Sequence, residues 1–252
     1  MNLLAFDTST EVMSIAVSRT VDGAVSVWEH TGAGGSQASA HLIGQVMALL
    51  QQADLSLKDL DAICFGAGPG SFTGLRTACS VAQGLAYGAG VPVLAVDSLL
   101  AVAEEARFQA LVDQPACRIT ALLDARMDEM YAATWGWDGA LWTELAESAL
   151  LRPEALQTQG DVLAGNVFGV YAGRLGTEHG GAQSTAQVIA LPTAAAMLRV
   201  APHMLAAGLA VDAALALPRY IRDKVAKTTA ERDHEKASAR EAAQAAAVAV
   251  SI

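Results

Sequence analysis

The sequence is poor in basic residues: 16 Lys and Arg stand against 26 Asp and Glu, which gives a formal net charge of -10. A protein that binds nucleic acid by itself usually carries a basic patch, and no such cluster of Lys and Arg is visible. If RNA is involved in the function, we therefore expect another subunit to supply the positive surface.

Cysteine is scarce as well. The chain has Cys64, Cys79 and Cys117, an odd count without a C-x-x-C pair. This pattern argues against a disulfide framework or a zinc site and predicts reduced core cysteines in a cytoplasmic protein. The sequence also lacks a basic stretch followed by a long apolar segment at its start, and it lacks an uncharged apolar run of about 18 residues. We therefore expect neither a secretory leader nor a membrane span.

What the chain does contain is apolar bulk. Of 252 residues, 53% are hydrophobic and only 17% are charged, a composition typical of a globular protein rather than a disordered one. This length suits one large domain or two lobes.

The first half alternates strand and helix patterns. An Asp22-Gly23 pair between two β-rich runs predicts a hairpin, and Ser98 is a candidate N-cap for a helix. Apolar spacing predicts strands at 3–6, 13–19, 24–30, 61–65 and 91–96, and helices at 39–53, 74–87 and 98–108.

The second half repeats the opening of the first. Asp7 ends an apolar run and is followed by Met13, while Asp124 ends another and is followed by Met130. The distance from the aspartate to the next Asp-Gly pair is 15 residues in the first half and 14 in the second. Two matches in register favour an internal duplication, that is, two related α/β lobes with a mixed sheet in each.

The second copy is less regular. Pro153 should open a short helix, residues 162–164 form a strand, and glycines from Gly165 to Gly181 mark loops. Residues 193–207 read as a helix that Pro202 would kink or divide, and 218–225 as a compact closing segment. The predicted parts are a first lobe at 1–111, a degenerate second lobe at 112–227, and an Ala-rich, charged tail at 228–252 that is a frayed helix or disordered.

Two polar turns are candidate anion sites. The first is Asp7-Thr8-Ser9-Thr10, where hydroxyls and backbone N–H groups could accept a phosphate and Asp7 could hold a metal-bound water. The alternative is a turn whose side chains bond their own backbone. Asp124-Ala-Arg126 takes the equivalent place in the second lobe, where a phosphotransferase of this architecture would need Asp-x-Gly.

The second turn runs from Gly66 to Arg76, GAGPGSFTGLR, between a strand and a helix. That context attracts anions, although the spacing fits neither a Walker A loop nor a dinucleotide fingerprint. The candidate contacts here are Gly68, Gly70, Ser71 and Arg76. Arg76 lies where the helix dipole disfavours a cation, so we expect it to answer a carboxylate or a ligand. A turn that only closes the fold is the alternative.

Two helices are candidates for a partner interface. One carries a nearly bare stripe of small residues that would let another helix approach closely, within the chain or from a partner. Together the two helices could form half of a four-helix bundle between subunits. The predicted interface residues are His41, Leu42, Gln45, Val46, Leu49, Gly74, Leu75, Ala78, Ala82 and Leu85.

Catalytic patterns are missing from the sequence. A metal pair on a helix needs a second ligand four residues after His41, and that residue is Gln45, so no metal site is predicted. Gly-x-Ser-x-Gly is absent, and Ser71 has no evident base nearby in sequence.

Four segments together resemble the TsaB (YeaZ) family: FDTST near the start, FGAGPGSFTGLRTACSVAQGLAYGAGVPVLAVDSL, DARMDEMYAA, and LPRYIRDKVA near the end. The resemblance covers residues 1 to about 227, and the GPGSFTGLR segment is highly specific.

The resemblance implies an actin/hexokinase/Hsp70-like (ASKHA) fold and a role in forming N6-threonylcarbamoyladenosine on the tRNA adenosine beside the anticodon. In this family the transfer is performed by the TsaD paralogue, which binds metal through a His-x-x-x-His helix. TsaB-like proteins pair with TsaD through the helices flanking the GPGSFTGLR turn, and a TsaE ATPase joins the assembly. The resemblance thus implies contact with tRNA only through the complex, ATP or ADP at its interface if anywhere, and a homodimer through the same surface in some relatives.

Two other functions stay open at this point. An ASKHA kinase for a small metabolite would use Asp7-Thr8-Ser9-Thr10 as its first phosphate turn, although the second turn is unsuited. A peptidase acting on its partner is the remaining alternative. The preferred interpretation makes GAGPGSFTGLR a rigid turn that aims two helices at another subunit, with phosphate contact secondary.

Overall fold

The fold begins with a three-stranded meander. The computed structural model describes residues 1–158, 162–175 and 186–222. Strands β1 (Leu3–Asp7), β2 (Val12–Val21) and β3 (Ala24–Ala33) pair antiparallel. Asp22 and Gly23 join β2 to β3 with φ of 50° and 81°, the left-handed backbone that an Asp-Gly hairpin adopts. The predicted hairpin is confirmed.

Two parallel strands complete the first sheet. β4 (Ala62–Gly68) pairs with β1, and β5 (Val93–Asp97) pairs with β4, which gives the order β3-β2-β1-β4-β5. Every residue of β1 and β4 is buried, as expected of central strands covered on both faces.

The second sheet repeats this order. β6 (Cys117–Arg126), β7 (Glu129–Trp137) and β8 (Trp142–Leu151) form the meander, and β9 (Val162–Gly165) and β10 (Gln187–Ile189) add parallel strands. The order β8-β7-β6-β9-β10 matches the first sheet strand for strand. The predicted duplicated α/β fold of the ASKHA type is confirmed.

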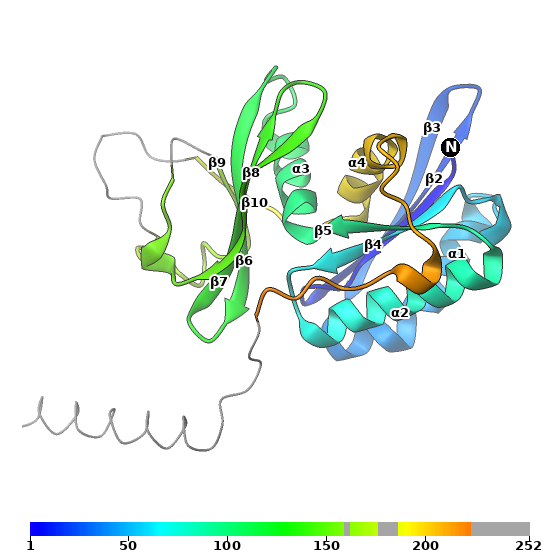
Figure 1. Cartoon of the computed structure of the whole chain (residues 1–252), viewed down its shortest axis with the longest axis horizontal. Helices are drawn as coiled ribbons and strands as arrows, with labels where there is room; N and C mark the ends of the chain where they lie inside the picture. The colour runs from blue at the N-terminus through cyan, green and yellow to red at the C-terminus, as the bar shows by residue number, and fades with distance from the viewer. Residues whose placement is uncertain (159–161, 176–185, 223–252) are drawn as a thin grey trace, which may run out of the picture. The chain divides into compact units, whose positions relative to one another are not determined.

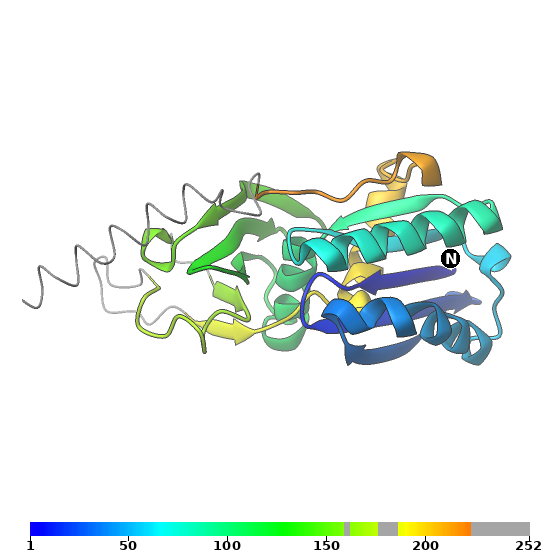
Figure 2. The same ribbon diagram turned by 90° about the horizontal axis from the view of Figure 1, so that it is seen from below.

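Helices cover both faces of the first sheet (Figures 1 and 2). α1 (Ala38–Gln52) and α2 (Phe72–Ala89) lie side by side on one face and share a core with Phe6, Ile15 and Phe65. α3 (Ser98–Ala110) and α4 (Ala194–Ala206) pack in a second core that contains residues of both sheets. The two sheets are therefore joined through α3 and α4.

The predicted N-cap of α3 is wrong. Asp97, not Ser98, is the N-cap of α3: its Oδ1 accepts hydrogen bonds from the N–H groups of Leu99 and Leu100 at 2.7 and 3.1 Å, and a carboxylate favours this position. Pro202 was predicted to kink or divide the last helix; it does not divide it, because α4 continues through Pro202 to Ala206. Pro153 does open a short helix, the 3-10 turn η3 (Pro153–Ala155).

The chain returns to the first sheet after α4. Val211 pairs with Val93 of β5, and the 3-10 turn η4 (Ala213–Leu215) leads into a segment along α2. The predicted lobe boundary at residue 111 therefore divides the strands of the first sheet from those of the second. It does not divide the chain into separately packed lobes, because α4 and residues 211–221 pack on the first sheet. The predicted tail at 228–252 lies outside the described residues, as do 223–225 of the predicted closing segment and 176–181 of the predicted glycine loops.

Within the described part of the chain, each helix is too short or too polar to cross a membrane.

Candidate functional site

Asp7, Thr8 and Ser9, at the start of the turn after β1, are closed to solvent. The side chain of Asp7 is fully buried, and its Oδ1 accepts hydrogen bonds from the N–H and the hydroxyl of Ser9, both at 2.7 Å. Its Oδ2 accepts a hydrogen bond from the hydroxyl of Ser98 at 2.9 Å. Burial raises the pKa of Asp7, while these hydrogen bonds oppose the shift. The polar atoms of this turn therefore face one another.

Three glycines bring the second turn directly onto the first. A Cβ at Gly66 would lie 1.8 Å from the Asp7 carboxylate, one at Gly70 would lie 2.5 Å from Ser9, and one at Gly74 would lie 1.8 Å from the carbonyl oxygen of Thr8. The Thr8 hydroxyl donates to the Gly74 carbonyl at 2.7 Å. These glycines therefore serve close approach of the backbone to itself.

This packing corrects the predicted anion contacts. Asp7, Thr8 and Ser9 are buried and bonded within the chain, so their side chains are not available to a nucleotide in this fold. Thr10 bonds Val12. Of the turn residues, Ser71 accepts a hydrogen bond from the Gly74 N–H as the N-cap of α2, and its own N–H donates to the Ser9 carbonyl at 2.7 Å.

The first residues of the closing segment, 218–221, lie over the same turn. The N–H of Arg219 donates to the Ala67 carbonyl at 2.7 Å, and a Cβ at Gly68 would lie 2.7 Å from the Arg219 carbonyl. Sequence reasoning treated this segment as compact but did not connect it to the turn. The only available signal was that LPRYIRDKVA belongs to the same set of motifs.

The sequence predicted that Arg76 meets a carboxylate or a ligand, and within the described residues no carboxylate pairs with it. Its Nε donates to the Tyr220 hydroxyl at 3.2 Å, and its guanidinium lies 3.8 Å from the centre of the Phe72 ring. Phe72 and Tyr220 also contact each other, with ring centroids 5.3 Å apart. The cation is thus stabilised by aromatic faces, and it helps hold the closing segment on α2.

Asp97 anchors the closing segment from the other side. Its Oδ2 lies 3.1 Å from the Arg219 guanidinium. The pKa of Asp97 is raised to about 6: burial is the largest cause and Glu144 adds to it, while the N–H groups of Leu100 and Leu99 and the Arg219 guanidinium oppose the shift.

The equivalent turn of the second lobe is closed by ion pairs. Arg126 lies 3.1 Å from Asp124 and 2.9 Å from Glu11, which follows the first turn. Arg126, Met127 and Asp128 all adopt positive φ, between 58° and 63°, a backbone that costs free energy for such residues. The Tyr171 hydroxyl donates to Asp124 at 2.9 Å, and burial is the largest cause that raises the pKa of Tyr171 to about 12.

The predicted interface residues divide into core and surface. The structure places six of them in the core, so their prediction as partner contacts is wrong: Leu42, Val46, Leu49, Leu75, Ala78 and Ala82. Gly74 is likewise buried against Thr8. The stripe of small residues on α2 thus packs within the chain, which was the default interpretation of this pattern. His41 is exposed, and Gln45 and Leu85 are half-buried.

A different set of side chains forms the outer face of α1 and α2, called the helix face below. Ile43 and Met47 of α1 are 50% and 47% exposed, and Tyr87 of α2 is 84% exposed. Gly44 and Gly84 have open space where a Cβ would stand. Large apolar side chains beside bare backbone permit close approach of another helix.

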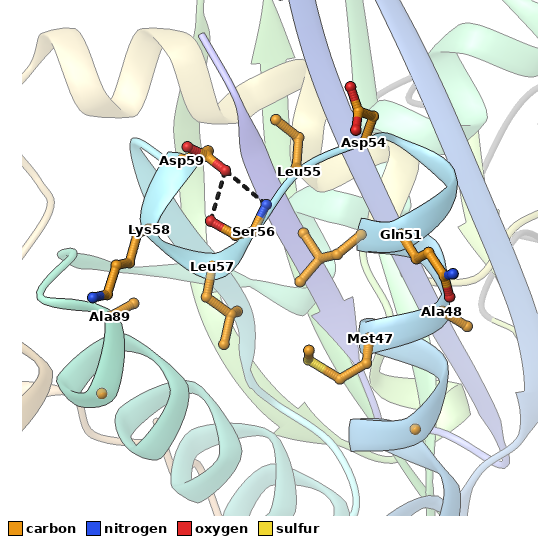
Figure 3. Close-up of a pocket in the computed structure, with 13 residues that line it drawn as sticks. Met47, Ala48, Gln51, Asp54, Leu55, Ser56, Leu57, Lys58, Asp59 and Ala89 are labelled. Carbon is orange, nitrogen blue, oxygen red and sulfur yellow. Dashed lines mark hydrogen bonds between the residues drawn. The ribbon is translucent and has the colours of Figure 1, made fainter.

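A groove continues the helix face at the C-terminal ends of both helices (Figure 3). It encloses about 1050 Å³ and is bounded by the end of α1, the 3-10 turn η2 (Leu57–Asp59) and the end of α2. Met47 and Leu57 point into it from opposite sides, and Asp59 accepts hydrogen bonds from the N–H and hydroxyl of Ser56.

The described residues do not form a set of ligands for a metal ion. No three His, Cys, Asp or Glu side chains of 1–158, 162–175 and 186–222 gather closely enough to hold an ion.

Comparison with known proteins identifies the family. Residues 35–247 match the family model described as "TsaD: tRNA N6-adenosine threonylcarbamoyltransferase". The chain is 35% identical over 232 residues to the tRNA threonylcarbamoyladenosine biosynthesis protein TsaB of Escherichia coli (strain K12), covering 90% of this chain and 96% of that protein.

Two further matches agree with this. TsaB of Haemophilus influenzae is 32% identical over 241 residues, covering 89% of this chain and 95% of that protein. The solved structure of YeaZ from Pseudomonas aeruginosa superimposes with a TM-score of 0.74 at 35% identity, covering 87% of this chain and 99% of that one. The chain therefore belongs to the TsaB (YeaZ) family.

Proposed function

We propose that this protein is a non-catalytic partner of a TsaD-type enzyme in the formation of N6-threonylcarbamoyladenosine on tRNA, next to the anticodon. Membership in a family whose curated relatives are named for the biosynthesis of this nucleoside supports the pathway. Two features support the non-catalytic role: the side chains of Asp7, Thr8 and Ser9 after β1 are buried and hydrogen-bonded within the chain, and Arg126 after β6 is paired with Asp124 and Glu11.

The observation that carries the proposal is the first turn. In a phosphotransferase of this architecture, the hydroxyls and N–H groups of Asp7-Thr8-Ser9-Thr10 would face a ligand. In this chain Gly70 and Gly74 bring α2 against Thr8 and Ser9 and fill that space. ATP or ADP, if present in the complex, would then bind at the interface with the partner rather than in this chain alone.

The helix face is the surface we assign to the TsaD-type partner. Ile43 and Met47 would supply the apolar centre, with His41 and Gln45 beside them on α1 and Leu85 on α2. A homodimer would use the same surface and would compete with the partner. A TsaE-like ATPase would join the assembled complex, tRNA would be reached only through it, and the complex would work in the cytoplasm.

The decisive experiment is a reconstitution. The TsaD-type enzyme, the TsaE-like ATPase, threonylcarbamoyl-adenylate and tRNA are combined with and without this chain, and modified nucleoside is measured. We expect no product from this chain alone and at least about a tenfold gain when it is added to the enzyme. Full activity in its absence would contradict the proposal.

A variant pair tests the surface. Met47→Asp places a charge in the centre of the helix face and should weaken partner binding at least about tenfold. Val25→Asp is the matched control, because Val25 is an apolar side chain of β3 that is 63% exposed and does not belong to the helix face. Equal binding by both variants in a calorimetric titration would move the interface elsewhere, while the role in tRNA modification would stand.

A further inference from the structure

A second cavity lies away from the turns and the helix face. It has a volume of about 460 Å³ and is enclosed by α3, by α4 with the residues just after it, and by the β7–β8 hairpin. α3 contributes Leu100, Glu104 and Arg107, which share one helix face by their spacing. This volume is within the range of small-molecule sites.

Glu104 organises the polar wall of the cavity. Its carboxylate is 2% exposed, and each oxygen accepts two hydrogen bonds. Arg107 donates from Nε and Nη2 at 2.9 and 3.0 Å, Arg199 donates from Nε at 2.8 Å, and Trp142 donates from Nε1 at 3.0 Å. A carboxylate bonded in this way has little capacity left for a cationic ligand.

The arginine donors are not all used. Arg107 and Arg199 each keep an Nη1 group without a hydrogen-bond partner among the described residues, although Glu105 accepts from Nη2 of Arg199 at 2.6 Å. His203, exposed on α4, lines the same cavity. The charged side-chain groups still open to a ligand are therefore guanidinium donors, which pair best with a carboxylate.

The remaining wall is apolar and aromatic. The rings of Trp137 and Trp142 lie 5.4 Å apart by their centroids, and the Arg107 guanidinium lies 4.6 Å from the centre of the Trp137 ring. Leu100 and Met204 continue this wall. A flat apolar group would gain area burial and ring contacts here.

We propose that this cavity binds a small aryl carboxylate, with the carboxylate on Arg107 and the ring against Trp137 and Trp142. Such a ligand would contact α3, α4 and the second sheet at once. Because it binds only the folded chain, it should raise the unfolding temperature. This inference does not depend on the tRNA-modification role.

The test uses 2-naphthoate and its uncharged analogue 2-naphthalenemethanol, each titrated into the full chain by calorimetry. We expect naphthoate to bind with a Kd below about 1 mM and the alcohol at least about tenfold more weakly. Arg107→Gln should remove the preference for the acid.

A cavity-filling pair keeps the test independent of the Glu104 network. Ala207 lines the cavity and is exposed, while neighbouring Ala206 is exposed outside the lining. Ala207→Phe should weaken naphthoate binding at least about tenfold, and Ala206→Phe should leave it unchanged. Absence of saturable naphthoate binding, equal affinity for acid and alcohol, or equal binding by the two phenylalanine variants would overturn the proposal.

Discussion

The turns after β1 and β6 occupy equivalent places in two sheets of the same strand order, yet different interactions close them. In the turn after β1, Asp7, Thr8 and Ser9 are buried, and glycine backbone lies against Thr8 and Ser9. The second is held by Arg126, which is 66% exposed and pairs with Asp124 and Glu11. The two copies share their topology, but packed backbone closes the first of these turns and ion pairs close the other.

The two kinds of closure differ in how much free energy they carry. Close-packed backbone tolerates no added atom, because neighbouring atoms cannot move without disturbing the core. Exposed ion pairs contribute little and are screened by salt. Substitutions that disturb the packed turn after β1 should therefore lower the free energy of unfolding far more than substitutions in the turn after β6.

The largest effect is expected for Gly74→Ala. Its Cβ would meet the Thr8 carbonyl oxygen at 1.8 Å, so we expect a loss on the order of 4 kcal/mol in urea unfolding. Gly84→Ala on the same helix is the matched control, because its Cβ meets open space. It should stabilise by about 0.5–1 kcal/mol. A similar result for the two variants would show that the first turn is not closed sterically.

Protonation of Asp97 is expected to change the free energy of unfolding by a smaller amount. The Asp97 carboxylate holds the closing segment through Arg219. Its folded pKa is raised to about 6 from 3.8, so the stability it contributes is full below pH 3.8 and is lost as pH rises through about 6. Between pH 7 and pH 5 the wild type should gain about 1.3 kcal/mol relative to Asp97→Asn. The measurement is urea unfolding of both proteins across this range; parallel pH dependences would contradict the assignment.

The smallest effect on the free energy of unfolding is expected in the turn after β6. Arg126→Gln should cost about 0.5 kcal/mol at low salt and close to nothing at about 1 M NaCl. Lys58→Gln is a suitable control, because Lys58 is exposed and forms no ion pair with the described residues. A loss of unfolding free energy above about 2 kcal/mol that does not depend on salt would mean that the turn after β6 is also closed by packing.

Much of the architecture followed from local patterns. Strand and helix periodicity, the two Asp-Gly turns and the repeated aspartate-methionine spacing predicted both meanders and their duplication, because these features depend on neighbouring residues. The assignment of Ser98 as an N-cap failed by one residue, since both Asp97 and Ser98 are acceptable caps and only the backbone decides.

The candidate site was harder to predict because it depends on contacts between residues that are far apart in the sequence. Glycines at 66, 70 and 74 have the same sequence signature whether they approach a phosphate or another stretch of backbone, and the partner proved to be Asp7, Thr8 and Ser9. The small residues of α2 were ambiguous for the same reason. Neither the Arg219–Asp97 pair, 122 positions apart, nor the packing of α4 on the first sheet leaves a periodic signal.

The central claim is that both phosphate turns are closed in the isolated chain. Calorimetric titration of Mg-ATP into the purified protein tests it most directly, with the TsaD-type enzyme as a comparison sample. The closed geometry predicts no saturable binding, that is, a Kd weaker than about 1 mM. Binding in the micromolar range that is weakened by Thr8→Val would contradict the claim, because it would mean that the first turn opens to accept a nucleotide.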